Sequence, residues 1–174
     1  MVIWLIGLSG AGKTTIGKCV HREWKKHEPN TVLVDGDEIR ELFSLNQEDS
    51  DYSLDGRRKN AERIKHLCAW LDRQGVNVVC NILLLFGDVS DWNRENLSGY
   101  LEVYISTPLN VVKKRDSKGL YSAAEKGEMK NVVGIDIPFP PPAHPDLTID
   151  NSDSNPEHEL VAKQILSRVK GHAA

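Results

Sequence analysis

A glycine-rich segment between an apolar run and a helical pattern constrains this chain more than any other feature. Residues 7–14 read GLSGAGKT, an uninterrupted match to the pattern G-x-x-x-x-G-K-[ST]. The residues before it, 2–6, are apolar and have strand character, and helical periodicity follows it. In this context the glycines let the backbone curl so that its N–H groups converge, and the helix N-terminus adds a positive dipole. The segment therefore predicts a phosphate-binding loop at the end of a buried strand.

The same loop predicts the phosphate donor of a reaction. In this motif the lysine, here Lys13, reaches the β- and γ-phosphates of a nucleoside triphosphate, and the hydroxyl of Thr14 binds Mg²⁺. A glycine-rich turn without a ligand is the alternative, but every fixed position of the motif is filled. We therefore expect a nucleoside triphosphate with Mg²⁺ at this loop.

Short apolar segments alternate with helical patterns along the rest of the chain. The candidate strands are residues 2–6, 31–34, 76–81, 101–105 and 147–149. They do not alternate apolar with polar residues, which is typical of parallel strands covered on both faces. They predict a single α/β domain over the whole chain (1–174), a doubly wound parallel sheet of the P-loop NTPase type, with ligands at the carboxyl ends of its strands.

Composition and charge restrict the partners and the compartment that we expect for the protein. The 174 residues are 40% hydrophobic and 27% charged, with a net charge of −3. This charge argues against a protein that coats nucleic acid or a membrane surface, so locally placed cations must hold an anionic ligand. No apolar run approaches the roughly 20 residues that span a bilayer, and no signal peptide is visible. Three dispersed cysteines lack metal-ligand spacing and indicate reduced thiols. We expect a cytoplasmic protein without a nucleic-acid polymer or a membrane as partner.

Two carboxylates follow the second predicted strand. Asp35 and Asp37 lie at a strand's carboxyl end, where a parallel sheet binds its ligands. One could hold Mg²⁺ through water while the other accepts the proton of an attacking hydroxyl. The sequence leaves open which of the two is the base. A solvated acidic turn that caps a helix starting near Glu38 is the alternative.

A second cluster lies on a predicted helix that runs to about Gln74. At helical spacing Arg57, Asn60 and Arg63 continue the core-facing apolar arc, whereas five other charged residues, Lys65 among them, occupy the other side. Two arginines and an asparagine on this arc predict the lip of an anion-binding pocket. Long side chains that reach water along the helix surface are the alternative.

A third cluster alternates cations with glycines. Residues 115–121 read RDSKGLY, and KGE follows at 126–128, before Lys130. Glycine hinges between cations are typical of a lid that closes over phosphates and excludes water. A solvated charged helix is the alternative. We expect a lid at approximately residues 115–135.

Taken together, these segments resemble adenylyl-sulfate kinase, a family of P-loop kinases that phosphorylate the 3′-hydroxyl of adenosine 5′-phosphosulfate with ATP. GLSGAGKTT, VDGDEIR, an R-x-x-N-x-x-R pattern, RDSKGLY, and GIDIPF followed by HPDLTID occur in the family's order over nearly the whole chain. RDSKGLY with GIDIPF is much more specific than a phosphate loop alone. The resemblance implies ATP and Mg²⁺ as cofactors, a small nucleotide as substrate, and a homodimer.

The motifs and the resemblance together assign site residues. The catalytic residues expected are Lys13, Asp35 and Asp37, with Thr14 and Asp35 at the metal. The residues expected to bind ATP are Gly7, Ser9, Gly10, Ala11, Gly12, Lys13, Thr14, Thr15 and Arg115. The residues expected at the acceptor are Asp37, Arg40, Tyr52, Arg57, Asn60, Arg63, Leu84, Lys118, Leu120, Tyr121, Gly134, Ile135 and Phe139. Tyr52 stands where the family has a phenylalanine that stacks on the acceptor base.

One acceptor-side segment departs from the family. After the third strand the family reads S-F-I-S-P-Y-R, whereas residues 81–87 of this chain read NILLLFG. A serine that faces the acceptor is replaced by Leu84, and an arginine by Gly87, which removes a cation expected near the sulfate. The loss of such a charge-assisted contact weakens binding by about 1.5–3 kcal/mol. The departures leave the phosphate loop intact and place the acceptor's identity in question.

We therefore expect a kinase that transfers the γ-phosphate of ATP to the 3′-hydroxyl of a nucleoside 5′-phosphate derivative. Adenylyl sulfate is the default acceptor, and the apolar run 83–86 favours a less anionic alternative such as cytidine 5′-diphosphoramidate. A nucleotide-dependent switch has little support because the N-K-x-D motif for guanine is absent from the sequence. A catalytically silent relative is opposed by the retained Lys13, Thr14, Asp35 and Asp37.

Overall fold

A parallel β-sheet with helices on both faces forms the centre of the protein, whose computed structural model describes residues 1–43, 52–116, 118–152 and 157–170. Along these residues the elements are β1 (Val2–Ile6), α1 (Lys13–Lys25), β2 (Thr31–Asp35), α2 (Gly36–Leu42), α3 (Leu54–Arg73), β3 (Asn77–Ile82), α4 (Gly87–Asn96), β4 (Tyr100–Ser106), α5 (Leu109–Arg115), α6 (Leu120–Glu125), β5 (Leu147–Asp150) and α7 (His158–Lys170).

The strands of the described residues lie in the order β2-β3-β1-β4-β5, and each neighbouring pair is parallel. The predicted fold class is thereby confirmed. Every strand begins and ends within one residue of its predicted bounds. The prediction succeeds because strands buried on both faces are uninterrupted apolar runs: all of β1 is at most 1% exposed.

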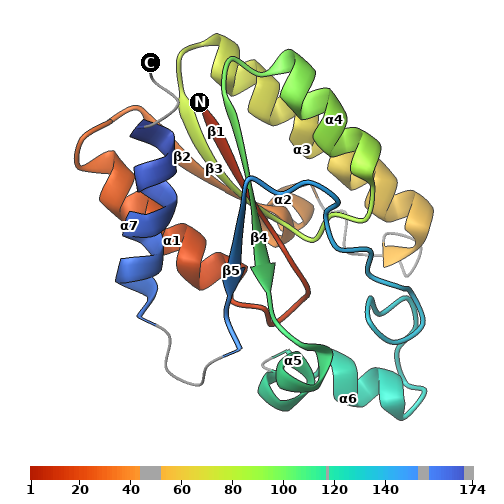
Figure 1. Cartoon of the computed structure of the whole chain (residues 1–174). Coiled ribbons are helices and arrows are strands. Elements are labelled where there is room, and N and C mark those ends of the chain that lie inside the picture. The colour runs from red at the N-terminus through yellow and green to blue at the C-terminus, as the bar shows by residue number, and fades with distance from the viewer. Residues whose placement is uncertain (44–51, 117, 153–156, 171–174) are drawn as a thin grey trace.

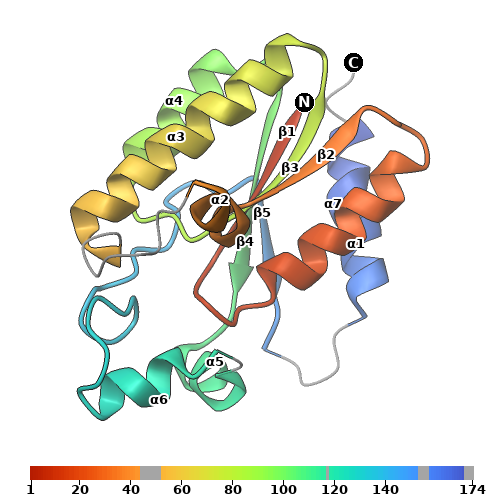
Figure 2. The same cartoon turned by 180° about the vertical axis from the view of Figure 1, so that it is seen from behind.

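Helices cover both faces of the sheet. Figure 1 and Figure 2 show α1 and α7 on one face and α3 and α4 on the other. Alternate residues of β1 enter these two layers. Leu5 packs in one core cluster with Ile165 of α7, and Trp4 packs in the other with Ile64 of α3. The central strand is therefore enclosed from both sides, which fixes the position of the loop that follows it.

Since all the strands run the same way, their carboxyl ends meet at one edge of the sheet. In Figure 1 this is the lower edge, where β4 points toward α5 and α6. β1 lies between β3 and β4, so the chain crosses from one side of β1 to the other on passing from β3 to β4. Ligands of such sheets bind at the carboxyl edge where the strand order reverses, and the loop after β1 lies there.

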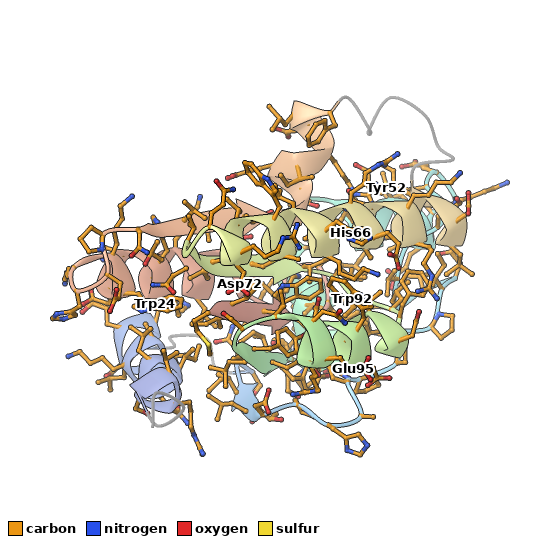
Figure 3. The ribbon with its side chains drawn as sticks, turned by 90° about the horizontal axis from the view of Figure 1, so that it is seen from above. Trp24, Tyr52, His66, Asp72, Trp92 and Glu95 are labelled. Carbon is orange, nitrogen blue, oxygen red and sulfur yellow. The ribbon has the colours of Figure 1, made fainter. Side chains whose placement is uncertain are left out.

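Lys65 departs from the pattern predicted for α3. Expected on the side away from the core, it is only 7% exposed. α4 covers this side of the helix: the Lys65 ammonium lies 4.6 Å from the ring centroid of Trp92, and His66 meets the same ring edge-on at 5.4 Å. Figure 3 shows His66 on α3 and Trp92 on the neighbouring α4. The prediction was wrong because the helical periodicity of α3 takes only the sheet as its packing partner, whereas α4 packs on the other side of α3.

The cysteines agree with the prediction of reduced thiols. Cys68 and Cys80 are buried, Cys19 is half-buried, and all three are free. Burial raises the pKa of the Cys80 thiol well above its ordinary value. Among the described helices, none is both long enough and apolar enough to cross a membrane.

Two residues of α7 test which of its faces supports the sheet. Ile165 is fully buried, whereas Leu160 on the same helix is 57% exposed. We expect Ile165→Ala to lower the free energy of unfolding by about 2–5 kcal/mol, because it leaves a cavity in the core. Leu160→Ala should change it by less than about 0.5 kcal/mol. Urea denaturation measures both, and equal losses would contradict the packing described.

Candidate active site

The phosphate-binding loop curls at the carboxyl end of β1. Gly10 and Gly12 have φ of 74° and 99°, in the left-handed region that favours glycine. A Cβ at Gly12 would also collide with the side-chain amide of Asn151, which donates to the Ala11 carbonyl at 2.7 Å. Thr107 donates its hydroxyl to the same carbonyl at 3.2 Å. Residues that follow β4 and β5 therefore hold the loop in shape.

The remaining residues expected at the donor lie in or beside this loop. A Cβ at Gly7 would lie 2.7 Å from the Ile105 carbonyl, so the loop begins tight against β4. Thr14 and Thr15 are exposed at the first turn of α1. Arg115, at the end of α5, donates to the Asn151 carbonyl at 2.8 Å. The structure thus brings Arg115 to the side of the loop that Asn151 supports.

Lys13 already lies with its ammonium inside the curl of the loop. Its Nζ donates to the Leu8 carbonyl at 2.7 Å. Burial lowers the pKa of Lys13 to about 8, with a smaller contribution in the same direction from Lys118, although Asp37 and Asp35 oppose the shift. A neutral carbonyl compensates a buried charge poorly, so an entering phosphate would be the stronger partner for this ammonium.

Asp35 joins the phosphate loop to α2. Its Oδ2 accepts the Thr14 hydroxyl at 2.8 Å, and its Oδ1 accepts the Asp37 backbone N–H at 3.0 Å. The carboxylate is therefore the N-cap of α2, which begins at Gly36 rather than near Glu38 as predicted. The structure thus confirms a helix cap at Asp35, and the second carboxylate oxygen faces Thr14 of the phosphate loop.

Thr14 and Asp35 are suited to Mg²⁺. Their hydroxyl and carboxylate oxygens are hard donors that lie together beside the phosphate loop. In the described part of the chain, no three His, Cys, Asp or Glu side chains gather as a metal cage. Mg²⁺ commonly takes one or two protein oxygens and completes its shell with water and substrate phosphates. The donor set fits an ion that arrives with a nucleotide.

Asp37, near the start of α2, lies among three cations from α1, from α2 and from the segment between α5 and α6. Its carboxylate accepts a hydrogen bond from Lys118. Partial burial opposes its ionisation, but the hydrogen bond and charge of Lys118 and the charges of Lys13 and Arg40 hold the pKa of Asp37 below its ordinary value. The side chain is 64% exposed. An ionised, accessible carboxylate thus lies between the phosphate loop, α2 and the predicted lid.

Tyr52 lies near the start of α3 (Figure 3), close to two arginines. The Arg40 guanidinium is 5.0 Å from its ring centroid and that of Arg57 is 5.8 Å away. Arg57 donates to the carbonyls of Tyr52 and Asn131, each at 2.9 Å. Burial, and then the charge of Arg40, lower the pKa of Arg57. Two guanidinium groups that repel each other beside an aromatic ring are suited to an anion that carries a planar group.

Three other residues expected at the acceptor differ in burial, and one of them lies away from Tyr52. Asn60 is buried, and its Oδ1 has no hydrogen-bond partner among the described residues. Leu84 is also buried, in the core cluster on the α3 side. Arg63 is exposed and lines a cavity between α2 and α3, together with Ile39 and Phe43. The structure therefore does not group Arg63 with Tyr52 and Arg57.

The segment predicted as a lid contacts the phosphate loop directly. Tyr121 is 2% exposed, and its hydroxyl donates to the Ser9 carbonyl at 2.9 Å. Burial raises the pKa of Tyr121 to about 12. Gly119, with φ of 66°, precedes Leu120, the first residue of α6. Together with Lys118 on Asp37, these contacts connect residues 118–121 to both sides of the site.

The loop of residues 134–139 closes another side. It lines an open cavity of about 520 Å³ together with Leu8 and the end of β4. Gly134, Ile135 and Phe139 all border this cavity. The Phe139 ring lies 6.2 Å from that of Tyr104. The structure thus brings these three predicted residues together beside the phosphate loop.

Sequence reasoning missed three supporting residues. Asn81 donates to Asp35, whereas Asn151 and Thr107 hold the Ala11 carbonyl. The available signal was a polar residue at or just after the end of a buried strand. That signal marks a position at the carboxyl edge but does not identify the partner.

Comparisons with known proteins show which proteins this chain is similar to. The sequence profile of the family described as adenylylsulphate kinase matches residues 1–150. A cytidine diphosphoramidate kinase of Campylobacter jejuni is 39% identical over 92% of this chain and 91% of its own. An adenylyl-sulfate kinase of Pseudomonas aeruginosa is 36% identical over 95% of this chain and 83% of its own. The Mycobacterium tuberculosis APS kinase CysC, solved with AMPPNP and APS, has a TM-score of 0.84 at 26% identity over 97% of this chain and 96% of its own.

The environment of Lys13 predicts that donor binding depends on pH. The free protein loses the Lys13 proton near pH 8, whereas a bound polyphosphate retains it, so binding above that pH requires proton uptake. We expect a non-hydrolysable ATP analogue to bind roughly ten-fold more weakly at pH 9 than at pH 7. Calorimetry in buffers of different ionisation enthalpy measures both the affinity and the proton uptake.

Two variants separate this effect from general alkaline weakening. Lys13→Ala should bind weakly at both pH values and lose the difference. Lys18→Ala, on the exposed side of the same helix, should keep it. An affinity of the unaltered protein that does not change between the two pH values would contradict the role of Lys13.

Proposed function

The chain belongs to the adenylylsulphate kinase family, and from this premise we propose that it transfers the γ-phosphate of ATP to the 3′-hydroxyl of a nucleoside 5′-phosphate derivative. The observation that carries the proposal is the position of Asp37. Its carboxylate lies among Lys13 of the phosphate loop, Lys118 of the predicted lid and Arg40 of α2. A hydroxyl bound at this carboxylate would face the end of a triphosphate held by the loop.

On the donor side, Lys13 exchanges the Leu8 carbonyl for the β- and γ-phosphate oxygens. The loop N–H groups, held in place by Asn151 and Thr107, surround the phosphates. Thr14 and Asp35 would hold Mg²⁺, which would supply further neutralisation of the phosphate charge. Lys13 reduces the repulsion that an incoming oxygen nucleophile meets.

On the acceptor side, Arg40 and Arg57 bind the anionic 5′-group, and Tyr52 stacks on the base. Asp37 orients the 3′-hydroxyl and accepts its proton. The acceptor oxygen forms a bond to the γ-phosphorus as the bond to the bridging oxygen of ADP breaks, so the phosphoryl group passes in line between them. Lys118 must leave Asp37 before the hydroxyl binds, and the incoming phosphates offer it a new partner.

Adenylyl sulfate is the acceptor that the family implies, but the segment after β3 favours a second candidate. Leu84 is buried, and a Cβ at Gly87 would meet nothing within 4 Å. The neighbouring cation, Arg58, already bonds Asp88 at 2.7 Å and lies 4.1 Å from the Phe86 ring centroid. With its charge balanced by Asp88, Arg58 is a poor substitute for the arginine that the family places at position 87. An acceptor whose terminal group has an uncharged amine in place of one oxygen, such as cytidine 5′-diphosphoramidate, suits this segment better.

The proposed function also includes a compartment, an oligomeric state and a class of partner. We propose a cytoplasmic homodimer that binds small nucleotides and neither nucleic-acid polymers nor membranes. Family resemblance supports the dimer, and the net charge of −3 supports the absence of polymer partners. Light scattering coupled to gel filtration measures the oligomeric state, and a monomer at micromolar concentration would contradict the dimer.

A nucleotide panel tests the proposed acceptor. We expect ADP release to depend on an acceptor, and kcat/KM to be higher with cytidine 5′-diphosphoramidate than with adenylyl sulfate. Plain AMP and CMP serve as controls for acceptors without the second group. A higher value with adenylyl sulfate would contradict the preference, and no acceptor-dependent release with any nucleotide would contradict the kinase itself.

Asp37→Asn tests the proposed base. The amide keeps the size of the side chain but accepts a proton poorly, so turnover should fall by at least about ten-fold. The affinity for ATP should stay within about two-fold, because Asp37 contacts the acceptor. Asp91→Asn, an exposed change on α4, is the matched control. Unchanged turnover in Asp37→Asn would remove Asp37 from catalysis.

A further inference from the structure

Asp35 has a third partner that the mechanism does not use. Asn81, in β3, donates its side-chain N–H to Asp35 Oδ2 at 3.2 Å. The same oxygen accepts the Thr14 hydroxyl at 2.8 Å. Asn81 stands opposite Asp35 in the pairing of β2 with β3, and opposite Leu5 in the pairing of β3 with β1. The amide therefore reaches the metal-side oxygen from the centre of the sheet.

This amide occupies an unfavourable place. Asn81 is 2% exposed, and its Oδ1 has no hydrogen-bond partner among the described residues. An unpaired buried acceptor lowers stability, so a residue chosen for packing alone would be apolar here. The position of Asn81 in an otherwise apolar strand end therefore requires a reason other than the core.

Gly17 of α1 makes room for the amide. A Cβ at Gly17 would overlap both the oxygen and the nitrogen of the Asn81 side chain. Gly17 is buried in the interior of the helix, where glycine is less favourable than alanine. Its φ does not require glycine. Two locally unfavourable residues thus meet at one point, and what they provide together is the hydrogen bond to Asp35.

We propose that Asn81 is a positioning residue for the Mg²⁺ site, and that Gly17 is required to admit its amide. The neutral N–H fixes the Asp35 carboxylate so that Oδ2 stays beside Thr14, while Oδ1 stays on the Asp37 N–H. Because the donor carries no charge, it orients the carboxylate without cancelling the negative charge that binds a cation. The inference rests on the donor half of the proposed function and is independent of the acceptor.

The alternative is that Asn81 only stabilises the fold, and a matched control separates the two roles. Asn93 in α4 is likewise buried, and its side-chain amide lies by the Tyr100 hydroxyl, away from Asp35. Asn81→Ala and Asn93→Ala therefore remove comparable groups, one beside Asp35 and one beside Tyr100. Only the first should alter metal binding.

The experiment measures Mn²⁺ as a spin probe for Mg²⁺, bound to the full chain with a non-hydrolysable ATP analogue. In Asn81→Ala the Mn²⁺ affinity should fall by roughly 10–100-fold, the range for groups that orient metal ligands. The affinity for the analogue in EDTA should change by less than about two-fold, because the contact acts on the metal. Asn93→Ala should leave both affinities unchanged.

Gly17→Ala supplies a second route to the same contact. The added methyl should displace the Asn81 amide and weaken Mn²⁺ binding in the same direction. In the double variant Gly17→Ala/Asn81→Ala the loss should be no larger than in Asn81→Ala alone, because both changes remove one hydrogen bond. Additive losses would overturn the role of Gly17.

Unchanged Mn²⁺ affinity in Asn81→Ala, or an equal loss in Asn93→Ala, would overturn the role of Asn81. These outcomes are distinct from a failure of the acceptor proposal. If the unaltered protein phosphorylates no nucleotide of the panel but shows the expected Mn²⁺ losses, the inference stands and the acceptor proposal fails.

Discussion

The carboxylate of Asp35 is the interaction on which the site depends. It accepts hydrogen bonds from Thr14 at the start of α1, from the Asp37 N–H at the start of α2, and from Asn81 in β3. These partners lie 21, 2 and 46 residues away along the chain. They meet because β2, β3 and β1 pair in parallel, with their carboxyl ends at one edge. The core that encloses β1 thus determines where the metal ligands and Asp37 lie.

Most of the cations of the site have neutral hydrogen-bond partners that a phosphate can replace. Lys13, Arg57 and Arg115 each donate to a backbone carbonyl within the described structure. Hydrogen bonds between charged partners are stronger than those to neutral carbonyls, so a phosphate can take over these donors. Lys118 is different, because its partner is the carboxylate of Asp37. The exchange of that partner connects acceptor binding to the exposure of the base.

The parts that the sequence predicts best are those that depend on local pattern. Strands 2–6 to 147–149 are found within one residue because burial on both faces leaves a continuous apolar signal. The phosphate loop is equally local. Asn81, Asn151 and Lys65 escape prediction because their roles come from partners on other elements. Asn151 lies 140 residues from the carbonyl to which it donates. Lys65 is buried by α4, a packing partner that the periodicity of α3 does not reveal.

The central claim is that the γ-phosphate of ATP moves to a nucleotide 3′-hydroxyl at Asp37. The most direct measurement is a proton–phosphorus correlation NMR spectrum of the product formed from ATP and cytidine 5′-diphosphoramidate. We expect a new phosphate resonance coupled to the ribose H3′, present with the unaltered protein and strongly reduced with Asp37→Asn. A phosphate coupled to H2′, or attached to the 5′-chain, would contradict it.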